Sequence, residues 1–69
     1  MAKRLLAKID GFGKEYRVYR DDRVQYNHYG VYERMWNRAT CSWSTHLLER
    51  YSTYTDSLFA VARHVMNDR

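Results

Sequence analysis

The chain contains no proline, one cysteine and three glycines among its 69 residues. The single cysteine, Cys41, excludes an intramolecular disulfide. No apolar stretch approaches the roughly 20 residues that a membrane-spanning helix needs. The apolar run that follows Lys3 and Arg4 stops at Lys8, which is too short for the core of a secretion signal. These absences predict a cytoplasmic protein that has no membrane partner.

The short length limits what the chain can build. Residues 1–69 are enough for a single domain, near the lower limit for folding without disulfides or metals. A domain of this size buries only about 60% of the surface that its unfolded chain exposes. Little interior is therefore left for a buried catalytic pocket and the side chains that would support it.

Residues of the kinds that carry catalysis or bind metals are few and scattered. Cys41 and the three histidines, His28, His46 and His64, form neither a C-x-x-C nor an H-x-x-x-H pair. The Gly11-Phe-Gly13 sequence is not followed by the residues of a phosphate-binding loop. We therefore predict no catalytic residue, no metal and no cofactor, hence not an enzyme, and we interpret Cys41 as a small buried thiol.

Alternating, β-preferring segments occupy the first part of the chain. In the first of them, Leu5, Ala7 and Ile9 fall on one side of the predicted strand. Asp10 to Lys14 is a loop with Asp-Gly turn chemistry, Asp21-Asp22 is a tight turn, and Gly30 marks a bend or bulge. The segments predict strands at residues 3–9, 15–20, 23–28 and 31–36, the last two either separate or continuous.

The rest of the chain contains one ambiguous segment and one clear helix. Residues 42–54 fit both helical spacing and alternation; their threonine and aromatic content favours a strand over about 45–53. Asp56 or Thr55 can cap a helix from Ser57 to about Asn67. Its core-facing side is predicted to contain Leu58, Val61, Ala62 and Val65, with Phe59 and Met66 at the edge.

The expected fold is therefore α+β, an antiparallel meander of four to five strands with one C-terminal helix packed on one face. A twelve-residue helix is about 18 Å long and 10 Å wide, whereas four strands span about 19 Å. One helix leaves the second face of the sheet bare, and the residues predicted there are aromatic and cationic. The predicted partner-binding residues are Arg17, Tyr19, Arg20, Arg23, Tyr32, Arg34 and Trp36.

Two segments resemble small phage and mobile-element proteins that consist of a short meander and a final helix. They are the run from Lys14 to Asp21 and the step from Tyr54 to Leu58 into a helix that carries Ala60 and Ala62. That group includes anti-defence inhibitors, such as anti-CRISPR proteins, and host-takeover factors. The resemblance implies a protein that occludes a site on a host protein or nucleoprotein complex, in the host cell cytoplasm.

The composition leaves two functions open. Twelve basic residues against eight acidic ones give a formal charge of +4, and seven tyrosines and two tryptophans accompany them. Arginine, tyrosine and tryptophan are enriched at protein-binding hot spots, which favours a small non-enzymatic inhibitor or adaptor. The alternative is a nucleic-acid-binding module, because arginine neutralises phosphates and tyrosine stacks on bases. A homodimer through the same face would enlarge so small a core.

Overall fold

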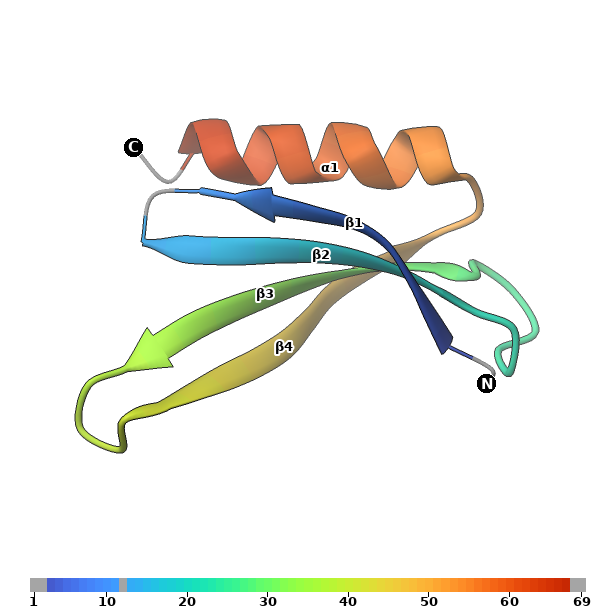
Figure 1. Ribbon diagram of the computed structural model, residues 1–69. Helices are drawn as coiled ribbons and strands as arrows, with labels where there is room; N and C mark the ends of the chain where they lie inside the picture. The colour runs from blue at the N-terminus through green and yellow to red at the C-terminus, as the bar shows by residue number, and fades with distance from the viewer. Residues whose placement is uncertain (1–2, 12, 68–69) are drawn as a thin grey trace.

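The computed structural model describes residues 3–11 and 13–67 and contains one open sheet and one helix (Figure 1). The sheet is an antiparallel meander with strand order β1-β2-β3-β4, and the helix packs on one of its faces, so the predicted α+β class is confirmed. No helix in the described part of the chain has the length and apolar character needed to cross a bilayer. The elements are β1 (Lys3–Asp10), β2 (Lys14–Asp21), β3 (Tyr29–Asn37), β4 (Ser42–Tyr51) and α1 (Tyr54–Asn67).

The predictions of strands at residues 3–9, 15–20, 31–36 and 45–53 are confirmed, with shifts at the ends. The ambiguous segment is β4, which begins at Ser42 and ends at Tyr51. It pairs with β3 along its length; for example, Trp43 lies opposite Trp36. This cross-strand pairing decides between two conformations that local propensity leaves nearly equal.

The predicted strand at residues 23–28 is wrong. Residues 22–28 form the connection between β2 and β3, which is closed by a hydrogen bond of 2.8 Å from the Asp21 N–H to the His28 carbonyl. The Asp21 carboxylate accepts hydrogen bonds from the backbone and side chain of Arg23, which turns the chain back. Asp21-Asp22 is therefore not a two-residue turn. Gly30 lies inside β3 and not at a bend; the bulge nearest to it is in β4, where Leu48 is the extra residue opposite Val31 and Tyr32.

A bulge in β1 changes which of its side chains face the core. The register with β2 shifts between Leu5 and Ala7. Ala7 and Ile9 therefore lie on the side covered by α1, which we call the helix face. Leu5 lies opposite Tyr19 on the other side, the open face. The prediction that Leu5, Ala7 and Ile9 share one side is wrong for Leu5, because one extra residue reverses the alternation.

The loop predicted between β1 and β2 is confirmed. Gly13 has a φ of 71°, a left-handed conformation that glycine adopts without strain. The Gly11 N–H donates to the Lys14 carbonyl at 2.9 Å and closes the connection. Phe12 lies outside the described residues.

The helix begins at Tyr54, three residues before the predicted start. Its cap is Thr53, not Thr55 or Asp56: the Thr53 hydroxyl oxygen accepts a hydrogen bond of 3.2 Å from the Asp56 N–H. The predicted core-facing side is also wrong in part. The buried helical residues are Ser57, Ala60 and Val61, which are small enough to bring the helix axis close to the sheet.

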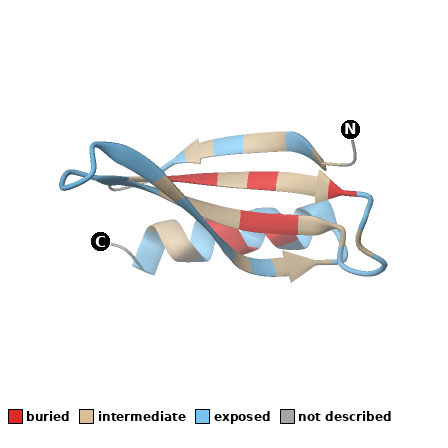
Figure 2. Ribbon diagram, turned by 90° about the horizontal axis from the view of Figure 1, so that it is seen from below, coloured by how far each residue is buried: buried red, intermediate tan, exposed pale blue. Residues whose placement is uncertain are grey.

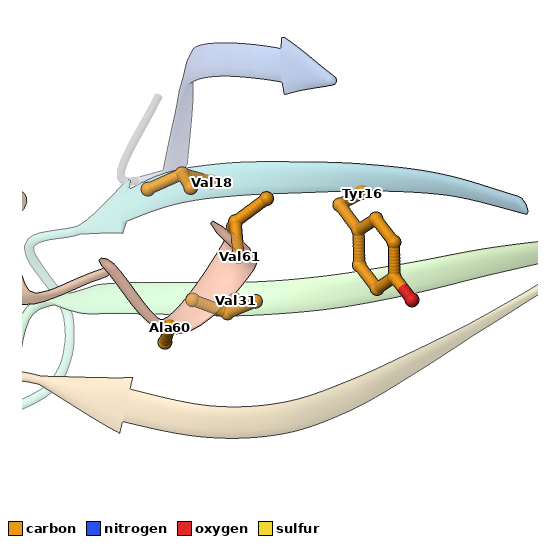
Figure 3. Packing of buried hydrophobic residues seen from close by; sticks show 5 residues of the cluster. All are labelled: Tyr16, Val18, Val31, Ala60 and Val61. Carbon is orange, nitrogen blue, oxygen red and sulfur yellow. The ribbon is translucent and has the colours of Figure 1, made fainter. Parts of the chain in front are cut away.

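The core is small and lies between α1 and the two central strands. Figure 3 shows Tyr16 and Val18 from β2, Val31 from β3, and Ala60 and Val61 from α1 meeting in this layer. The buried segments form a band across the middle of the molecule, and the tip of the β3–β4 hairpin is exposed (Figure 2). So few buried side chains make every other apolar contact important for stability.

Candidate interaction surface

The open face of the sheet carries no covering layer within the described chain, since α1 packs against the opposite side (Figures 1 and 2). The cross-strand register identifies the side chains on this face. They are Lys3, Leu5, Lys8 and Asp10 of β1, Glu15, Arg17, Tyr19 and Asp21 of β2, Gly30, Tyr32, Arg34 and Trp36 of β3, and Trp43, Thr45, Leu47 and Arg50 of β4.

Five of the seven predicted partner-binding residues lie together on the open face. They are Arg17, Tyr19, Tyr32, Arg34 and Trp36.

The other two predicted residues lie apart from these five. Arg23 belongs to the β2–β3 connection and is bound to Asp21 at the margin of the open face. Arg20 is on the helix face, where its guanidinium donates to the Tyr29 hydroxyl at 3.1 Å, and the Tyr29 ring contacts Tyr54 of α1. Grouping Arg20 with Arg17 was therefore wrong, as the alternation of a strand already implies.

Two aromatic pairs bridge neighbouring strands of the open face. The Tyr19 and Tyr32 rings meet edge to face at 5.3 Å, and Lys3 Nζ lies 4.6 Å and 4.4 Å from their centroids. Such edge-to-face and cation–π contacts hold both rings in fixed orientations.

The second pair lies near the end of the β3–β4 hairpin. The Trp36 and Trp43 rings are 5.6 Å apart, with the Arg34 guanidinium 4.8 Å from the Trp43 centroid. Trp36 and Trp43 remain 47% and 48% exposed. Trp43 is not among the residues predicted from the sequence, because residues 42–54 fit both a helix and a strand; its alternation with Thr45 and Leu47 is the signal that places it on this face.

Gly30 makes room for the side chains at the centre of the open face. A Cβ at this position would lie 3.0 Å from Cε1 of Tyr32 and 3.4 Å from Cδ1 of Leu47. The absence of a side chain lets the ring and the methyl group lie over the backbone of β3. This close approach, not a bend, explains the glycine.

Glu15 organises the cations on β1, β2 and β3. Its buried carboxylate accepts hydrogen bonds from the guanidinium groups of Arg17 and Arg34, the latter at 3.3 Å, and Lys8 Nζ lies 3.5 Å away. Burial acts to raise the pKa of Glu15, but the hydrogen bonds from the two arginines outweigh it and leave the pKa below its usual value. Arg17 also donates to the Tyr19 hydroxyl at 3.2 Å, so the carboxylate fixes the position of a predicted anchor.

Asp21 neutralises Arg23 in the same way. Its two carboxylate oxygens each accept a 3.0 Å hydrogen bond from the Arg23 guanidinium, and one also accepts the Arg23 N–H. These side-chain and backbone hydrogen bonds lower the pKa of Asp21 to about 2. With Arg23 included, six cationic and three acidic side chains leave the open face with an excess of three positive charges.

Other reactive side chains lie apart from one another. Cys41 is exposed in the β3–β4 turn, so its interpretation as a buried thiol is wrong. Within residues 3–11 and 13–67 no three His, Cys, Asp or Glu side chains are placed to hold a metal ion. His28 contacts the Asp21 carbonyl and His64 stacks on Tyr16, so both rings have structural contacts.

Comparison with protein-family models, with curated proteins and with solved structures gives no match.

Proposed function

We propose that this chain is a small non-enzymatic binding protein whose open face docks on a host protein or nucleoprotein complex and occludes a site there. The observation that carries the proposal is the half exposure of Trp36 and Trp43 on a face that no described element covers. Exposed apolar patches with cationic margins are typical of interaction sites. Occlusion is the mode implied by the resemblance to small anti-defence proteins.

The arrangement of charges favours a protein as the partner. Glu15 and Asp21 lie within the face and hold Arg17, Arg34 and Arg23 in fixed positions. Side chains that are already ordered lose less conformational entropy on binding. A partner that presents both carboxylates and donors complements such a mixed surface, whereas a uniform polyanion meets repulsion from the acidic groups.

The test replaces the two indoles together. Hot-spot aromatic residues contribute 2 kcal/mol or more, so Trp36→Ser combined with Trp43→Ser should weaken capture of the partner at least roughly 30-fold. Affinity capture from a lysate of the native host, quantified by mass spectrometry, measures this loss. Phe59→Ser combined with Met66→Ser is the matched control, because both residues are exposed on α1. Equal capture by the tryptophan variant and wild type would contradict the proposal.

Nucleic acid is the second candidate, supported by the excess positive charge beside stackable rings. Titration of the protein against single-stranded and duplex DNA at two salt concentrations separates the two functions. A micromolar or tighter affinity that falls steeply with salt supports the nucleic-acid module. The absence of any complex at low salt removes it and leaves protein binding.

A further inference from the structure

The helix carries a second exposed apolar surface that the proposed function does not use. Leu58, Phe59 and Met66 are 38%, 62% and 70% exposed, Ala62 is exposed, and Val65 is half-buried. We call these five residues the outer helix surface. It borders an apolar groove of about 320 Å³, lined by Ile9 of β1 and by Leu58, Val61, Ala62, Val65 and Met66.

The sequence of this surface is symmetric about Ala62. Leu58 and Phe59 precede it by four and three residues, and Val65 and Met66 follow it by three and four. Residues at these spacings share one side of a helix. A two-fold axis at Ala62 would therefore place Leu58 and Phe59 of one copy against Met66 and Val65 of a second, antiparallel copy, and the small alanine allows the helices to approach closely.

We propose that a second copy of this chain covers the outer helix surface, with two α1 helices packed antiparallel and crossing at Ala62. Charge selects this surface over the open face. Each copy has a formal charge of +4 and an open face with excess positive charge, whereas all five residues of the outer helix surface are uncharged. Two copies can therefore meet through uncharged side chains, so we propose this dimer in place of the one through the sheet.

The available area suits a weak dimer. Taking about 200 Å² for a fully exposed large side chain, Leu58, Phe59 and Met66 present on the order of 350 Å² per copy. With the neighbouring residues, two copies bury on the order of 1,000 Å² in total, the lower limit for a specific interface. The dimer also covers part of the groove beside Ile9, which adds apolar burial to a domain with a small core.

This inference does not depend on the proposed function. The outer helix surface and the open face lie on opposite sides of the molecule (Figure 1). Dimerisation at α1 therefore leaves both open faces free and directs them away from each other.

Sedimentation of the full chain over a micromolar to millimolar range tests the dimer. We expect wild type to shift from monomer to dimer as concentration rises, and Phe59→Ser with Met66→Ser to remain monomeric. Trp36→Ser with Trp43→Ser should dimerise as wild type does, which separates this test from that of the open face. A wild type that stays monomeric throughout, or a dimer that survives the helix variant, would overturn the proposal.

A cross-linking test addresses the register. Helix axes 8–10 Å apart bring the two Ala62 Cα atoms to about 4–5 Å, within reach of a disulfide. In a Cys41→Ser background, oxidation should cross-link Ala62→Cys rapidly. Asp56→Cys, six residues from the axis, should not cross-link, because its two copies are about 18 Å apart. Cross-linking of the Asp56 variant alone would disprove the register.

The same helix could face a lipid surface instead of a second copy, and vesicles of anionic phospholipid separate the two. Flotation of wild type with the vesicles, lost in Phe59→Ser with Met66→Ser while wild type sediments as a monomer, would overturn the dimer.

Discussion

Glu15 sets the positions of the cations at the scale of single residues. Its carboxylate is shared by Arg17, Arg34 and Lys8, so its removal leaves three positive charges close together. We expect Glu15→Gln to lower the free energy of unfolding by roughly 1 kcal/mol, because the arginines lose a charged acceptor. The urea midpoint of unfolding measures this change. Asp10→Asn, an exposed acid on the same face, is the control and should leave the midpoint nearly unchanged.

Asp21 gives the stability a specific dependence on pH. The Arg23 hydrogen bonds lower the pKa of Asp21 from the usual 3.8 to about 2 in the folded state. Its ionised form therefore stabilises the fold above pH 3.8, and that contribution is lost as the pH falls from 3.8 towards 2. The free energy of unfolding of wild type, measured with urea, should fall across this interval. The free energy of unfolding of Asp21→Asn should fall less steeply. Parallel declines would mean that the ion pair does not stabilise the fold.

Strand alternation fixes much of the open face from sequence at this scale. Arg17 with Tyr19, and Tyr32 with Arg34 and Trp36, share a face as their spacing requires. Alternation alone does not predict on which side of the sheet Arg23 and Leu5 lie. The side of Arg23 depends on a loop held by the Asp21 carboxylate. The side of Leu5 depends on a one-residue bulge that appears only in the pairing of β1 with β2.

Among the elements, the helix start provides a direct comparison of two cap assignments. Thr53 caps α1 through its hydroxyl, whereas Thr55, which the sequence offers as a cap beside Asp56, is an exposed residue within the first turn. Thr53→Ala should destabilise the protein by about 1 kcal/mol, because the Asp56 N–H loses its acceptor. Thermal or urea unfolding of this variant beside Thr55→Ala gives the comparison. A larger loss for Thr55→Ala would show that the helix starts later.

The helix itself was predictable as an element, but not the direction of its packed side. Its largest apolar residues, Phe59 and Met66, were placed at the edge of the core and are exposed, while Ser57 and Ala60 are fully buried. Hydrophobic spacing reports which apolar residues share one side of a helix and not which surface covers them. The apolar residues that lie outside the core form the outer helix surface, and the proposed dimer accounts for their spacing.

At the scale of the whole molecule, the two exposed surfaces, the open face and the outer helix surface, lie on opposite sides. A single helix covers one side of a four-stranded sheet, and the uncovered side carries the aromatic pairs and the cations that Glu15 and Asp21 hold in place. The bare face was expected from the widths of helix and sheet alone. The arrangement of side chains on that face could not be predicted from these widths. It depends on Gly30, the bulge in β1 and the shared carboxylates, which only the three-dimensional register shows.

Both tryptophans of the chain lie on the open face, so their signals report on that face alone. Labelling with 5-fluorotryptophan gives two ¹⁹F resonances, one from Trp36 and one from Trp43. On addition of the captured, unlabelled partner we expect both resonances to shift or broaden and to lose their sensitivity to the solvent. Two unchanged resonances in a complex whose size confirms binding would show that the partner docks elsewhere.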